Sequence, residues 1–105
     1  MKRDLSGEFF FHPKAKIEFF EAIEYYEDCV PGLGLEFSEE ILSTIQRIIY
    51  FPNAWGKFSK DTRRCLTKRF PFGIIYQVSE NKNEVLIIAV MQLNRTPNYW
   101  KDRIK

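Results

Sequence analysis

The order of hydrophobic and polar positions divides the chain into a helical half and a strand half. In residues 14–28, apolar side chains recur at helical spacing and glutamates occupy the positions between them. A second helical pattern fills residues 35–51 and ends before Pro52, because a proline disfavours the helical conformation in the residue before it. The PGLG stretch at 31–34 separates the two, so the pattern predicts a helical hairpin. The expected buried stripes consist of Ala15, Phe19, Ala22, Ile23 and Tyr26 in the first helix and of Phe37, Ile41, Ile45 and Ile48 in the second.

Short segments rich in β-branched and aromatic residues follow a different pattern and predict strands. These segments are 8–12, 62–69, 73–79 and 84–92. The polar NKN at 81–83 is typical of a hairpin connector, so the last two strands are expected to pair antiparallel, and 97–103 is expected to form a short terminal helix or turn. The expected fold is α+β, in the order β-α-α-β-β-β, with the helical hairpin packed on one face of a small, mainly antiparallel sheet. With 105 residues, the chain is expected to form one domain, 1–105.

Composition excludes several classes of protein. The longest apolar run, VLIIAVM at 85–91, is far shorter than the ~20 residues that span a bilayer, and the N-terminus has no apolar signal core. We therefore expect a cytoplasmic protein without a membrane partner. Cys29 and Cys65 belong to no Cys/His cluster, so they are expected to be reduced and unpaired, and we expect neither a metal site nor a cofactor.

Charge is unevenly distributed, although the net charge is only +2. Residues 18–40 contain eight acidic residues and no basic ones, and the carboxylates at 18–28 are expected on exposed positions. Residues 57–69 contain six basic residues against Asp61 alone. The basic region is expected to favour acidic partners.

Strand alternation predicts which side chains face away from the helices. If Ile74, Tyr76 and Val78 face the helices, an outward face is formed by Gly73, Ile75 and Gln77, with Arg64, Leu66 and Lys68 from the preceding strand and Ile87, Ala89 and Met91 from the following one. This face would be largely apolar with a basic rim, as protein interfaces commonly are. The alternative is that the chain's own C-terminal tail or a second copy covers it.

Several segments together resemble the RelE/ParE superfamily of toxins from bacterial type II toxin-antitoxin systems. They are TRRCLTKRFPFGIIYQV, the later EVLIIAVMQLNRTPNYWKDR, and the helix pair interrupted at PGLG and ended by FPNAW. The resemblance spans nearly the whole chain. It implies a plasmid-stabilisation type of protein that is toxic when free and is neutralised by a small antitoxin.

The superfamily has two main activities, and the residues favour one of them. RelE-like members cleave messenger RNA on the ribosome with a cluster of Arg, Lys and often Tyr, whereas ParE-like members inhibit DNA gyrase. The resemblance places neutral residues at three positions where the nucleases carry cations: Leu66, Gly73 and Leu93. Basic or tyrosine positions are matched by Arg64, Arg95 and Tyr99. Because phosphoryl chemistry needs convergent cations, the ParE-like activity is favoured.

The resulting hypothesis is a ParE-like toxin that acts by binding a protein, with no catalytic residue assigned. The expected contacts with the antitoxin or target are Arg64, Leu66, Lys68, Arg69, Ile75, Gln77, Met91, Leu93 and Arg95. Two alternatives stay open: a RelE-type endonuclease that uses Arg64, Lys68, Arg95 and Tyr99, and a decayed toxin that retains only antitoxin binding. DNA gyrase or the ribosome would be the target, and a homodimer is possible.

Overall fold

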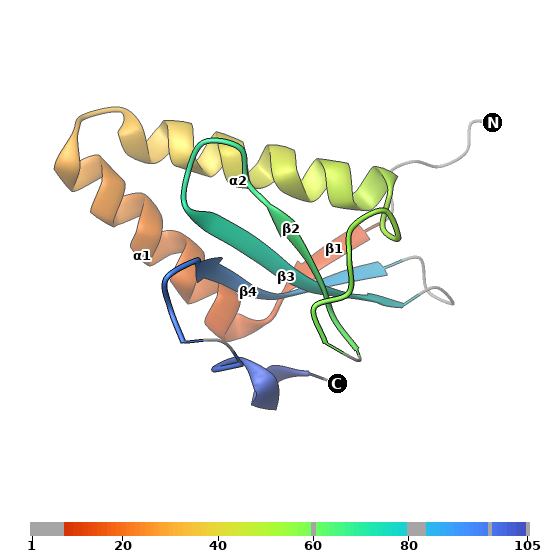
Figure 1. Cartoon of the computed structure of the whole chain (residues 1–105). Coiled ribbons are helices and arrows are strands. Elements are labelled where there is room, and N and C mark those ends of the chain that lie inside the picture. The colour runs from red at the N-terminus through yellow and green to blue at the C-terminus, as the bar shows by residue number, and fades with distance from the viewer. Residues whose placement is uncertain (1–7, 60, 80–83, 97, 105) are drawn as a thin grey trace.

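The computed structural model describes residues 8–59, 61–79, 84–96 and 98–104, and these contain the expected order of helices and strands (Figure 1). The elements are β1 (Glu8–Phe11), α1 (Pro13–Cys29), α2 (Leu33–Tyr50), β2 (Arg63–Leu66), β3 (Phe72–Ser79), β4 (Glu84–Gln92) and a short 3-10 helix, η1 (Lys101–Arg103). The connector expected at 81–83 lies outside the described residues. The α+β class is confirmed.

The strands form one mixed sheet in the order β1-β4-β3-β2. β1 runs parallel to β4, while β3 is antiparallel to both β4 and β2, which confirms the expected pairing of the last two strands. β2 is shorter than the expected segment 62–69 because the chain turns at Thr67. The Thr67 amide donates to the Phe72 carbonyl at 3.0 Å, and its hydroxyl donates to the Phe70 carbonyl at 2.6 Å. None of the helices that the structure describes is long and apolar enough to cross a membrane.

Both helices cover the same face of the sheet (Figure 1). α1 begins at Pro13, whose fixed φ suits the first helical position, and the His12 imidazole accepts a hydrogen bond from the Lys14 amide at 3.1 Å. The turn into α2 is closed by the Glu27 carboxylate, which accepts hydrogen bonds from the amides of Gly32 and Gly34. Gly32 has φ +88°, a conformation that residues with a Cβ rarely adopt.

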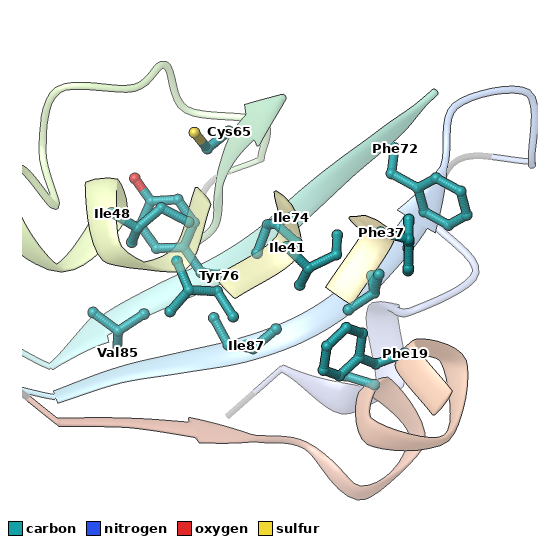
Figure 2. Close-up of a cluster of buried hydrophobic side chains, with 13 residues drawn as sticks. Phe19, Phe37, Ile41, Ile48, Cys65, Phe72, Ile74, Tyr76, Val85 and Ile87 are labelled. Atoms are coloured by element: carbon teal, nitrogen blue, oxygen red, sulfur yellow. The ribbon is translucent and has the colours of Figure 1, made fainter. Parts of the chain in front are cut away.

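The main core lies between the helical hairpin and the sheet (Figure 2). The expected stripes of both helices are confirmed, since every one of those side chains belongs to this cluster. Ile74, Tyr76 and Cys65 project from the strands into it, as alternation predicts. The Tyr76 hydroxyl donates to the Pro52 carbonyl at 2.8 Å, and burial raises the pKa of Tyr76 to about 12. Cys29 and Cys65 are both free thiols, and burial raises the pKa of the Cys65 thiol.

One expected side-chain direction is wrong. Ile87 was expected on the face away from the helices, yet it is fully buried in the core beneath them. The cause is a β-bulge: Ile75 pairs with Ala89 but Tyr76 pairs with Ile87, so Ile88 is an extra residue in β4. The extra residue reverses the alternation, which places Ile88 with Ala89 on the outer side and Ile87 on the inner side.

The close approach of the two helices at Gly34 predicts a large effect of one added methyl group. A Cβ at position 34 would lie 2.7 Å from the Ile23 carbonyl oxygen and 2.9 Å from Glu27 Cβ. Gly34→Ala should therefore lower the free energy of unfolding by about 1–3 kcal/mol, measured by urea denaturation. Ser43→Ala, at an exposed position of the same helix, is the control and should change it by about 0.5 kcal/mol or less. Equal stability of the two variants would show that the helices do not approach as closely as described.

Candidate protein-binding surface

The outer sheet face, which is the face turned away from α1 and α2, is covered in its middle by the C-terminal segment, residues 98–104 (Figure 1). Trp100 is fully buried there, and the partly buried Phe58, Tyr99 and Ile104 pack against the same cluster. The sheet residues beneath this cover are Ile75, Ile88, Ala89 and Met91. This part of the surface was expected either to be open or to be covered by the chain's own tail or a second copy. The chain's own tail covers it.

Ile75 and Met91 therefore do not form an open floor in this structure. Their exposed fractions are 0% and 2%. Their contact with an antitoxin stays a prediction, and it requires the C-terminal segment to move away. Gln77, the third expected contact on β3 and β4, is half-buried opposite Leu86.

The C-terminal segment is fixed by a carboxylate of α1. One oxygen of Glu18 accepts from the Val90 amide and the other from Arg103 Nη2, both at 3.0 Å. Arg103 Nη1 donates to the Ile88 carbonyl, also at 3.0 Å. β1 ends at Phe11, which pairs with Ile87 of β4. Beyond this pair β4 has no strand beside it on that edge within the described residues, and the Glu18 and Arg103 side chains bind its backbone groups there instead. Glu18 was expected to be exposed, but its side chain is only 13% exposed because it lies between α1 and β4.

Arg95 and Tyr99 form a second contact at this edge. The Arg95 guanidinium lies 3.9 Å from the Tyr99 ring centroid, and Arg103 lies 5.1 Å from it. Burial, followed by the negative charge of the nearby Glu18, raises the pKa of Tyr99. No partner with hydrogen-bond geometry exists among the described residues for three buried polar atoms of this segment: the Tyr99 hydroxyl, Trp100 Nε1 and Arg103 Nε.

The open part of the predicted surface lies over β2 and the turns at the end of the sheet. Leu66 on β2 is 47% exposed, and Leu93, which follows β4, is 40% exposed. Arg64 is half-buried, and its guanidinium lies 4.4 Å from the Phe58 ring centroid. Gly73 of β3 pairs with Leu66 of β2 on one side and with the covered Met91 of β4 on the other, so it lies between them.

Lys68 and Arg69 lie in the turn after β2, beside α2. The Lys68 amide donates to Glu40, and the Arg69 guanidinium pairs with Glu36 at 2.8 Å. Lys68 was expected to continue the strand and to face outward with Arg64 and Leu66. This expectation is wrong, because β2 ends at Leu66. Arg69 is thus already paired with an acidic residue of α2.

The four residues of the alternative endonuclease hypothesis divide between separate contacts. Arg95 and Tyr99 are brought together, at the β4 edge. Arg64 stacks on Phe58, and Lys68 lies in the β2–β3 turn. Among the described residues, no hydrogen bond, ion pair or ring contact joins Arg64 or Lys68 to Arg95 or Tyr99.

Sequence reasoning missed Glu18, Arg103 and Phe58. Glu18 carried a usable signal, because it stands three residues after Ala15 and four before Ala22 and therefore lies beside the buried stripe. The pairing with Arg103 joins residues far apart in the chain, and no local pattern indicates it. Within the described residues, no group of three or more His, Cys, Asp and Glu side chains could hold a metal ion.

Comparison with known proteins identifies a family by its sequence model and a similar fold by a solved structure. The family model described as "ParE toxin of type II toxin-antitoxin system, parDE" matches residues 9–96. A solved structure described as "Chromosomal ParDE TA system from P. aeruginosa" has a similar fold, with a TM-score of 0.72 and 17% sequence identity. The similarity covers 87% of this chain and 100% of that chain. The curated protein sequences contain no match.

The Glu18–Arg103 pair predicts a large loss of stability when one partner is neutralised. Glu18→Gln keeps an acceptor for the Val90 amide but leaves the Arg103 charge, whose side chain is 8% exposed, without a counter-charge. The free energy of unfolding should fall by about 3–5 kcal/mol, and Trp100 fluorescence should shift to the red as its cover loosens. Glu36→Gln is the matched control, because the Glu36–Arg69 pair is more than half exposed, and it should cost about 1 kcal/mol or less. A small effect of Glu18→Gln, equal to that of the control, would contradict this role of the pair.

Proposed function

This chain belongs to the ParE toxin family of type II toxin-antitoxin systems, and we propose that it acts in the cytoplasm by binding a cellular protein, without cutting RNA. The observation that carries the proposal is the family match over residues 9–96, which also confirms the resemblance seen in the sequence. DNA gyrase is the proposed target. A cognate antitoxin is proposed to neutralise the toxin by covering its open surface.

The distribution of cations supports binding over phosphoryl chemistry. An endonuclease must bring several cations to one scissile phosphate, because they stabilise charge that develops in the transition state. Here Leu66 and Gly73, which are neutral, lie near Arg64 on the sheet, so these two positions bring no second cation beside it. Arg95 is engaged at the other side of the sheet with Tyr99 and Glu18.

The environment of Tyr99 also opposes a role as general base. A general base works best when its pKa lies near the operating pH. Burial and the Glu18 carboxylate instead raise the pKa of the Tyr99 hydroxyl above that of an ordinary tyrosine. The surroundings of Tyr99 are those of a side chain that holds the C-terminal segment in place.

The accessible part of the predicted surface is the proposed first contact of the antitoxin. It includes Leu66, Leu93 and the half-buried Arg64, together with the exposed Lys68, Arg69 and Arg95. Apolar contact with the two leucines would contribute ~25 cal/mol per Å² buried, and Arg64 would orient an acidic segment. Ile75 and Met91 would join the contact only after the C-terminal segment has moved.

Induction of the protein in growing bacteria tests the target. We expect growth arrest, loss of negative supercoiling in a reporter plasmid and intact messenger RNA, with growth restored by co-expression of the antitoxin encoded beside the toxin. Messenger RNA cleavage with normal supercoiling would instead establish the endonuclease. Normal growth together with stable antitoxin binding would indicate a decayed toxin.

Tyr99→Phe separates a structural tyrosine from a catalytic one. The Tyr99 hydroxyl has no hydrogen-bond partner among the described residues, so its removal should change the free energy of unfolding by less than about 1 kcal/mol and leave toxicity intact. Tyr76→Phe is the control, because it removes the hydrogen bond to the Pro52 carbonyl and should cost about 1 kcal/mol. If Tyr99 were a general base, Tyr99→Phe would lower RNA cleavage in a translating extract by about 100-fold or more. Arg95→Ala would abolish that cleavage as well.

A further inference from the structure

A cationic pocket opens beside β2, next to the part of the outer sheet face that the C-terminal segment covers. Its volume is about 380 Å³. It is lined by Trp55, Gly56, Lys57, Phe58, Arg64 and Leu66. Two of these residues are cations and none is acidic, so the pocket presents positive charge beside aromatic and aliphatic surface.

Arg64 differs from the other arginines that the structure describes. Arg47 and Arg63 donate to oxygen atoms of the chain, and Arg69, Arg95 and Arg103 each lie within 4.0 Å of a glutamate carboxylate. The Arg64 guanidinium contacts the Phe58 ring and has neither a hydrogen bond nor a carboxylate partner among the described residues. Its N–H donors therefore have no acceptor among the described residues, and Arg64 lines the pocket.

Gly73 and Phe58 hold the Arg64 side chain in place. A Cβ added at position 73 would lie 3.3 Å from both Cγ and Cδ of Arg64, so the aliphatic stem crosses the space that a side chain at 73 would need. The guanidinium then rests on the Phe58 ring, and Phe58 packs on the buried Trp100 with ring centroids 5.8 Å apart. An arginine fixed in this way loses little conformational entropy when it binds an anion.

We propose that this pocket binds a carboxylate of an acidic protein segment, with Arg64 as its anchor. The inference rests on the proposed function, in which the toxin acts through protein contacts, and it names the chemistry of one such contact. The planar guanidinium matches a carboxylate with two parallel hydrogen bonds, and Lys57 adds a second positive charge. The exposed Leu66 provides an apolar surface for the aliphatic residue next to that carboxylate.

A protein ligand fits the pocket better than a nucleic acid does. Nucleic-acid binding depends on many phosphate contacts, and of the described residues that line the pocket only Lys57 and Arg64 are charged. A half-exposed leucine beside the cations gives a phosphate backbone no favourable contact, whereas an aliphatic side chain of a peptide would bury it.

Titration of the full chain with short peptides, followed by NMR, tests the pocket. The probes are a blocked peptide of alternating leucine and glutamate, its leucine and glutamine counterpart, and a single-stranded RNA oligonucleotide of similar length. Trp55 lines the pocket, so its indole N–H signal should move, while the backbone amide signals of α1 and α2, on the opposite face of the sheet (Figure 1), serve as internal reference. We expect saturable movement with the glutamate peptide and binding at least about tenfold weaker with the glutamine peptide.

Two pairs of variants show whether peptide binding depends on Arg64 and on the space beside it. Arg64→Gln should weaken glutamate-peptide binding by about tenfold or more, whereas Arg69→Gln removes the same charge from a residue already paired with Glu36 and should have no effect. Gly73→Ala should weaken binding severalfold by displacing the Arg64 stem. Gly56→Ala also changes a pocket residue, but its Cβ would meet nothing within 4 Å, so binding should persist.

Three results would overturn the inference: equal binding of the glutamate and glutamine peptides, tighter binding of the RNA, or unchanged binding by Arg64→Gln. Unchanged backbone amide signals of α1 and α2 in each variant verify that the fold is intact. Toxicity and neutralisation in cells are measured separately. If they persist while peptide binding fails, only the pocket inference falls; if peptide binding succeeds without toxicity, only the proposed toxin function falls.

Discussion

The Glu18 carboxylate joins three parts of the chain: α1, β4 and the C-terminal segment. It projects from α1, accepts the Val90 amide of β4 and pairs with Arg103 of the C-terminal segment. β4 needs this contact because β1 accompanies it only as far as Ile87. A buried ion pair contributes little net stability, since desolvation offsets the attraction, but it excludes other arrangements of its partners. Glu18 thereby determines where the last residues of the chain lie.

That placement divides the outer sheet face into a covered part and an open part. Trp100 covers the apolar residues of β3 and β4, while Leu66 and Arg64 on β2 remain beside an open pocket. Phe58 belongs to both parts, because its ring contacts Trp100 on one side and the Arg64 guanidinium on the other. Any displacement of the C-terminal segment would remove a support of Phe58 and so loosen Arg64. The two parts of the face are therefore mechanically connected.

Local periodicity was sufficient for the helices, their buried stripes, the strand order along the chain and the inward direction of Cys65, Ile74 and Tyr76. It failed where one residue or one distant contact changed the geometry. The bulge at Ile88 reverses the alternation of β4, and nothing in a run of seven apolar residues indicates where such an extra residue lies. The burial of Glu18 depends on Arg103, a partner 85 residues away. The C-terminal segment covers Ile75 because of that same long-range contact. The sequence therefore predicted the apolar face, but it did not determine which part of the chain or which partner covers it.

Gly73 bears on both the proposed contact with a carboxylate and the alternative of phosphate chemistry. The resemblance to the nucleases leads one to expect a cation at this position, and a glycine there removes a group that could stabilise a phosphate. The same glycine leaves the space that the Arg64 stem occupies. A Cβ added at position 73 would lie only 3.3 Å from Cγ and Cδ of Arg64. The Arg64 stem thus lies beside Gly73, its guanidinium contacts the Phe58 ring, and the residue lines the pocket. A single rigid arginine is poorly suited to phosphoryl transfer, which requires several convergent charges, but it is well suited to orient one carboxylate. The physical properties of position 73 therefore favour recognition over catalysis on this face.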